Sequence, residues 1–159
     1  MANVYLLAGF NNWGKTHLIT KLFNKGKFSK SIPAMLEERQ FCVVPQSNDD
    51  LGESGFIRAY QERIKALEGN NYSVTHVAAA FCPTKEKRND SLNILNKLFA
   101  KDKVFLIPIE YKWCGHAKLQ ISDIAQYYSQ ISNMTIHPLS QKDPAKVASD
   151  LKRLIAPLL

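Results

Sequence analysis

The chain has 159 residues, 45% of them apolar, and a net charge of +7. This composition excludes a disordered or fibrous chain and favours a single folded domain over residues 1–159. No apolar run approaches the about 20 residues that cross a bilayer, and we find no signal peptide. The three cysteines, Cys42, Cys82 and Cys114, lack the spacing of a zinc site or a disulfide framework. We therefore expect no membrane span and a cytoplasmic location.

Short apolar runs alternate with longer amphipathic stretches along the chain. The first run, residues 4–8, ends at a glycine and predicts a buried strand. Residues 14–25 have the apolar spacing of a helix, whereas residues 27–40 give no clear prediction. A second strand is predicted at 41–44, followed by a loop at 46–55 and a helix at 56–67.

The second half of the chain repeats this alternation. Strands are predicted at 74–81, 104–109 and 134–139. A basic loop spans 83–90, and Asp90 or Ser91 is expected to cap the helix that follows it. Ser122 and Asp123 are candidate caps for another helix, and Pro144 suits the first position of a last one.

This alternation predicts an α/β fold, a three-layer α/β/α sandwich with a mostly parallel sheet of about five strands. Ligands of such sheets bind at the carboxyl ends of the strands. The loops 9–16, 45–55, 82–90 and 110–118 are therefore expected to lie together at one edge of the sheet.

Residues 9–16, Gly-Phe-Asn-Asn-Trp-Gly-Lys-Thr, match the pattern G-x-x-x-x-G-K-T between the first strand and the first helix. Its glycines let backbone N–H groups point inward at phosphate oxygens, and the helix adds its positive end. The lysine of the pattern reaches the β- and γ-phosphates, and the hydroxyl ligates Mg²⁺.

This motif resembles the Walker A motif of the P-loop NTPase superfamily. The resemblance implies a P-loop NTPase-like fold and assigns phosphate and Mg²⁺ contacts to Gly9, Gly14, Lys15 and Thr16, with Lys15 also catalytic. We add the neighbouring loop residues to the candidate contacts of the nucleotide: Asn11, Asn12, Trp13 and His17. Trp13 could shield the phosphates or pack on the base of the nucleotide, or its side chain could equally face outward. For His17, which lies just inside the helix, we favour a structural role.

Members of this superfamily usually carry a second carboxylate at the end of an apolar strand, and no strand here ends clearly that way. Asp49 and Asp50, in the loop after the second strand, are the favoured metal ligands and catalytic candidates, and they begin a D-x-x-G match. Glu110, after the fourth strand, is the alternative, and Glu53 is a further acid. A site in which no carboxylate ligates Mg²⁺ directly also stays open.

The base specificity is weakly marked. The guanine-binding pattern N/T-K-x-D is absent, since Thr84-Lys85-Glu86-Lys87 ends in lysine, and this favours ATP over GTP. The basic segment 85–88 makes Arg88 a candidate for stabilising transferred phosphoryl charge. The same segment would equally suit an acidic partner.

Three functions fit these features. The first is an NTP hydrolase that drives or regulates an interaction with a protein partner, or with nucleic acid given the charge of +7. The second is a small nucleotide or metabolite kinase with the basic loop as its lid. The third is a catalytically weak nucleotide-binding subunit of a complex, which the missing second carboxylate favours.

Overall fold

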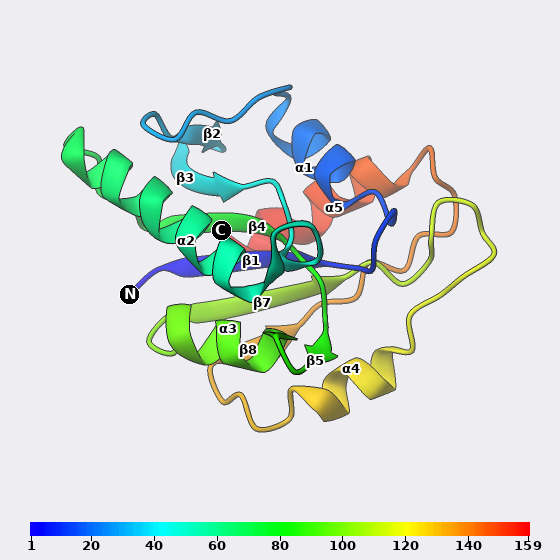
Figure 1. Ribbon diagram of the computed structural model, residues 1–159. Coiled ribbons are helices and arrows are strands. Elements are labelled where there is room, and N and C mark those ends of the chain that lie inside the picture. Colours follow the sequence, from blue (N-terminus) through cyan, green and yellow to red (C-terminus); the bar gives the residue numbers. More distant parts are fainter.

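A six-stranded sheet with the strand order β2-β3-β4-β1-β7-β8 forms the centre of the computed structural model, which describes residues 1–159 (Figure 1). All pairings are parallel except the edge pair β2-β3, which is antiparallel. The strands of this sheet are β1 (Asn3–Ala8), β2 (Ala34–Leu36), β3 (Arg39–Val44), β4 (His76–Phe81), β7 (Lys103–Pro108) and β8 (Met134–Ile136). A separate hairpin pairs β5 (Lys85–Glu86) with β6 (Asn89–Asp90).

Helices cover both faces of the sheet and give the fold three layers (Figure 1). The first face carries α1 (Lys15–Phe23) and α5 (Val147–Ile155), and a short 3₁₀ helix, η1 (Ala156–Leu158), follows α5. The opposite face carries α2 (Asn48–Gly69), α3 (Ser91–Leu98) and α4 (Ile121–Tyr127). None of these helices is both long enough and apolar enough to cross a bilayer.

Side chains that alternate along β1 build the two cores. Tyr5 and Leu7 join the cluster under α1 and α5, whereas Val4, Leu6 and Ala8 join the cluster under α2, α3 and α4. A strand in the middle of a parallel sheet is buried on both faces, which explains its uninterrupted apolar sequence. Each fully buried aliphatic or aromatic side chain stabilises the fold by about 1.5–3 kcal/mol, so the two cores hold the site's scaffold rigid.

The α/β sandwich and the parallel sheet are as predicted, but the sheet has six strands rather than about five. The additional strand is β2, which lies in the segment 27–40 that gave no clear prediction. It adds antiparallel to the exposed edge of β3.

The predicted loop at 46–55 is wrong, because α2 begins at Asn48. The hydroxyl of Ser47 accepts the N–H of Asp49 at 3.2 Å and caps the helix. Gly52 then interrupts the helix with φ 73°, a backbone angle that favours glycine. The predicted basic loop at 83–90 likewise contains the hairpin β5-β6.

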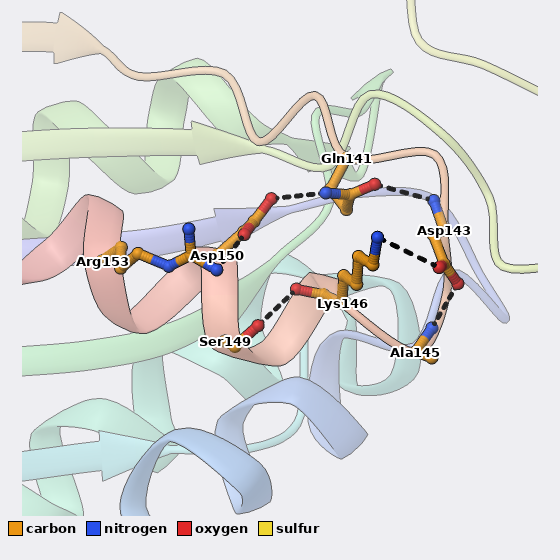
Figure 2. A network of polar contacts seen from close by, with 7 residues as sticks. All are labelled: Gln141, Asp143, Ala145, Lys146, Ser149, Asp150 and Arg153. Atoms are coloured by element: carbon orange, nitrogen blue, oxygen red, sulfur yellow. Dashed lines mark hydrogen bonds and ion pairs between the residues drawn. The ribbon is translucent and has the colours of Figure 1, made fainter.

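The helix caps agree with the prediction at one place and differ at two. Asp90 caps α3 as expected, since its carboxylate accepts the N–H of Leu92 at 2.9 Å. α4 follows Gln120 and has no side-chain cap, contrary to the prediction. α5 begins at Val147 rather than at Pro144, because Asp143 holds the N–H of Ala145 in a turn outside the helix (Figure 2).

Candidate functional site

Four loops meet at the carboxyl ends of the parallel strands, as predicted. The hydroxyl of Thr16 donates to the carbonyl of Pro45 at 2.7 Å, which joins the loop after β1 to the loop after β3. Asn48 then bonds to the backbone of Cys82 after β4. The indole N–H of Trp113, after β7, donates to the carbonyl of Asn12 at 2.6 Å.

The loop 9–16 curls around its own lysine. The N–H of Gly9 donates to the carbonyl of Phe81 at 3.0 Å and anchors the start of the loop on β4. The ammonium of Lys15 donates to the carbonyls of Gly9 and Phe10, both at 2.7 Å. This places the positive charge of Lys15 inside the ring of the loop.

Two glycines allow this shape. A Cβ on Gly9 would lie 3.1 Å from the Cβ of Trp13, a tighter contact than most Cβ atoms make, so the close approach of these residues favours a glycine. Gly14 has φ 82° immediately before α1, in the left-handed region that side chains disfavour. Asn12 also has a positive φ, 62°, which asparagine tolerates better than most residues.

Backbone donors at the start of α1 have no partners within the protein. The N–H groups from Gly14 to His17 donate to no other atom of the protein. They lie at the positive end of the helix dipole, and such a group of donors binds anions. The loop therefore combines a helix N-terminus with an enclosed ammonium.

Lys15 carries a buried charge that has no carboxylate in contact. Its side chain is only 7% exposed, and no ion pair neutralises it. Burial lowers the pKa of Lys15, while nearby Cys82, Asp49 and Asp50 oppose that shift. Because an unpaired buried charge is unfavourable, an anion that approaches Lys15 is stabilised.

A cavity of about 250 Å³ opens above the loop. It brings together most of the predicted contact residues with one acid: Asn11, Asn12, Trp13, Gly14, Lys15, Thr16, His17 and Asp50. Trp13 is buried and packs edge-on against Phe10, so the outward-facing reading of this side chain is wrong. The structure thus places a single carboxylate, that of Asp50, on the wall of the cavity.

Asp49 and Asp50 lie in the first turn of α2 rather than in a loop. Both are exposed, and neither forms an ion pair. Their position is set by Asn48, a fully buried residue that sequence reasoning missed. The sequence signal for a helix start at this point is Ser47, which precedes the acid Asp50 by three residues.

Asn48 attaches the acidic turn to the sheet. Its side-chain oxygen accepts the N–H of Cys82 at 2.7 Å, and its amide donates to the carbonyl of Cys82 at 2.9 Å. The same amide lies 3.1 Å from the oxygens of Thr84 and Asn89. These bonds hold the start of α2 beside the end of β4.

Gly9 and Asp49 are not among the residues that line this cavity, and neither are three further candidates, Arg88, Glu53 and Glu110. Arg88 lies at the exposed turn of the hairpin β5-β6, and its side chain makes no hydrogen bond or ion pair. The carboxylate of Glu53 accepts the N–H of Asp90 at 2.9 Å and thus supports the hairpin. Glu110 follows β7, where its backbone bonds to Leu119 and Leu139.

A second, more apolar cavity of about 380 Å³ lies beside the first and shares three residues with it, Trp13, Gly14 and His17. Sequence reasoning did not find this cavity. Its other lining residues come from α1, from the segments after β7 and β8, and from the start of α5: Leu18, Ile109, Tyr111, Trp113, Pro144 and Val147.

No protein-family model matches the chain, and the searches of curated proteins and of solved structures give no match either.

Proposed function

We propose that this protein is a P-loop nucleotide-binding protein that binds a nucleoside triphosphate with Mg²⁺, ATP in preference to GTP, and hydrolyses it to drive or regulate an interaction with a protein or nucleic-acid partner. One observation carries the proposal. The loop 9–16 surrounds the ammonium of Lys15 and continues into a helix whose first N–H groups have no protein acceptor.

The electrostatics of the loop support a polyphosphate as the ligand. The free N–H groups, the helix N-terminus and the buried Lys15 all attract negative charge at the same place. A triphosphate offers enough oxygens to engage all three. The net charge of +7 adds a general attraction for such an anion.

The residues beside the loop fit a magnesium ion that arrives with the nucleotide. The protein has no group of three or more acidic, histidine or cysteine side chains that would hold a metal by itself. Mg²⁺ is commonly bound by one or two carboxylates together with substrate phosphates. Thr16, Asp50 and Asp49 are the oxygen ligands proposed for this role, with Asp50 on the cavity wall.

The residues around the second cavity supply nothing that favours GTP over ATP. None of its lining residues is acidic, so the N1–H and N2–H groups of guanine would find no carboxylate there. The hydrogen-bonding pattern that rewards GTP over ATP is therefore missing. We expect GTP to bind no more tightly than ATP.

Hydrolysis is proposed to be slow in the isolated protein. β4, the neighbour of β1, is followed by Cys82 and Pro83 and so supplies no carboxylate at its end. The acids instead come from the first turn of α2, which Gly52 separates from the rest of that helix. This arrangement also supports a second candidate function, a nucleotide-binding subunit with weak catalysis.

The partner and the cellular setting are further parts of the proposal. Arg88 and the lysines of the hairpin are exposed, which suits contact with an acidic partner. Cys42 and Cys82 are free and buried, and Cys114 is free as well. Free thiols persist in a reducing compartment, which supports a cytoplasmic setting.

Turnover and binding measurements test the proposal together. Release of phosphate from Mg-ATP should be slow, should rise when the correct partner is added, and should fall in the Asp50→Asn variant. Asp123→Asn, which removes an acid in α4, is the matched control and should leave turnover unchanged. Tight binding of ATP without any turnover would favour the binding-subunit alternative, and absence of binding would refute both.

A further inference from the structure

The apolar cavity next to the loop 9–16 has the properties of a site for a flat aromatic ring. Six of its nine lining residues are hydrophobic, and its volume of about 380 Å³ is within the usual range for small-molecule sites. It contains both tryptophans of the chain, Trp13 and Trp113. Aromatic side chains bind planar rings by stacking, with little dependence on the groups at the ring's edge.

Trp113 is the unusual member of this cavity, because its side chain is 60% exposed. An exposed tryptophan leaves a large apolar surface in water, and a ring stacked on it would remove that surface from the solvent. The indole is nevertheless held in place, since its N–H donates to the carbonyl of Asn12 at 2.6 Å. Trp113 is thus attached directly to the loop that is proposed to hold phosphates.

The segment that contributes Pro144 to the cavity carries a network of polar contacts (Figure 2). Gln141 donates to the carboxylate of Asp150 at 2.7 Å and accepts the N–H of Asp143 at 3.0 Å. Asp143 in turn accepts the N–H of Ala145 and lies 4.0 Å from the ammonium of Lys146. This network orders the segment 141–146, so the wall formed by Pro144 and Val147 is already in position.

We propose that this cavity binds the purine ring of the nucleotide, with Trp113 as the stacking platform. The inference rests on the proposed function, because the phosphates of the same nucleotide would lie on the loop 9–16. The two cavities share Trp13, Gly14 and His17, so one ligand can extend from one into the other.

Recognition by stacking has a consequence for selectivity. A purine presents a larger flat surface to Trp113 than a pyrimidine does, so ATP and GTP bind more tightly than CTP and UTP. The cavity has no acidic lining residue that would reward guanine. The site therefore selects the size of the ring system more strongly than the pattern of donors and acceptors on its edge.

The test compares triphosphates with and without a base. ATP, GTP, CTP and inorganic tripolyphosphate are titrated with Mg²⁺ into the wild-type chain. Binding is followed by calorimetry and by tryptophan fluorescence, whose signal comes from Trp13 and Trp113. Trp113→Ala and Trp113→Phe are compared with Met35→Ala, which removes another exposed apolar side chain on β2. Thermal unfolding checks that each variant is folded.

The expected result is that Trp113→Ala weakens the binding of ATP and GTP by roughly 10- to 100-fold, the loss that removal of a stacking platform produces. Binding of tripolyphosphate should change much less, since only the bond from Trp113 to Asn12 of the loop is lost. Trp113→Phe should keep most of the affinity, because it keeps a ring. Equal affinity of ATP for the wild type and Trp113→Ala, or ATP no tighter than tripolyphosphate, would overturn the proposal. If neither tripolyphosphate nor any nucleotide binds, the proposed function itself fails and the base site falls with it.

Discussion

Replacing Asn48 by alanine is predicted to destabilise the protein and to loosen the acidic turn of α2. The side chain is fully buried and connects α2 to the backbone of Cys82 on both its N–H and its carbonyl. Alanine removes these bonds together with those to Thr84 and Asn89. It also leaves the N–H of Cys82 buried without an acceptor.

The size of the effect follows from these contacts. Each lost hydrogen bond is worth about 1 kcal/mol net, and a buried donor without a partner costs about 1–3 kcal/mol. The amide's bond to the carbonyl of Cys82 and one shared by Thr84 and Asn89 account for about 2 kcal/mol, and the unpaired N–H of Cys82 adds about 1–3 kcal/mol. We therefore expect a loss of about 3–5 kcal/mol in the free energy of unfolding. The free energy of unfolding of a typical domain is about 5–15 kcal/mol, so the variant should be measurably less stable than the wild type.

Urea unfolding of the wild type, Asn48→Ala and a control, Asn93→Ala, measures this loss. Asn93 is exposed on α3 and makes no side-chain hydrogen bond, so its removal should change the free energy of unfolding by less than about 0.5 kcal/mol. A loss below about 1 kcal/mol for Asn48→Ala would refute the reasoning, because the amide would then contribute no more than one ordinary hydrogen bond.

Three further predictions concern the loop, the acid and the pH dependence. Gly14→Ala places a side chain at φ 82° and should lower the free energy of unfolding by about 1–2 kcal/mol, measured by urea unfolding, whereas no change would mean that the backbone relaxes. Asp50→Asn should weaken ATP binding in the presence of Mg²⁺ more than in its absence, measured by calorimetry, and an equal effect would exclude Asp50 as a metal ligand. Burial lowers the pKa of His76, so the folded state takes up its proton at lower pH than the unfolded state, and stability should fall as the pH drops below about 6.5. When the free energy of unfolding is measured between pH 5 and 8, His76→Phe should reduce its slope against pH by up to about 1.4 kcal/mol per pH unit. An unchanged slope would contradict the assignment of this pH dependence to His76.

The parts of the fold that depend on local pattern were predictable from the sequence. The strand before Gly9 and the helix after Gly14 follow from an apolar run and a helical spacing that adjoin the motif. The gathering of four loops at one edge followed from the parallel arrangement of the strands. For these features the local sequence and the tertiary structure agree.

The features that sequence reasoning missed depend on contacts between distant residues. The start of α2 is held by bonds from Asn48 to Cys82, 34 residues away. Trp113 reaches Asn12 across 101 residues, so no local pattern reveals that it borders the loop. The edge strand β2 is only three residues long and carries too little alternation to be recognised.

Binding of Mg-ATP to the wild type and to Lys15→Ala, measured by calorimetry, tests the nucleotide site most directly. Lys21→Ala, which removes an exposed lysine from the same helix, controls for the loss of one charge. We predict that the wild type and Lys21→Ala bind Mg-ATP, while Lys15→Ala remains folded and shows no binding. Unchanged affinity of Lys15→Ala for Mg-ATP would contradict the role given to the loop 9–16.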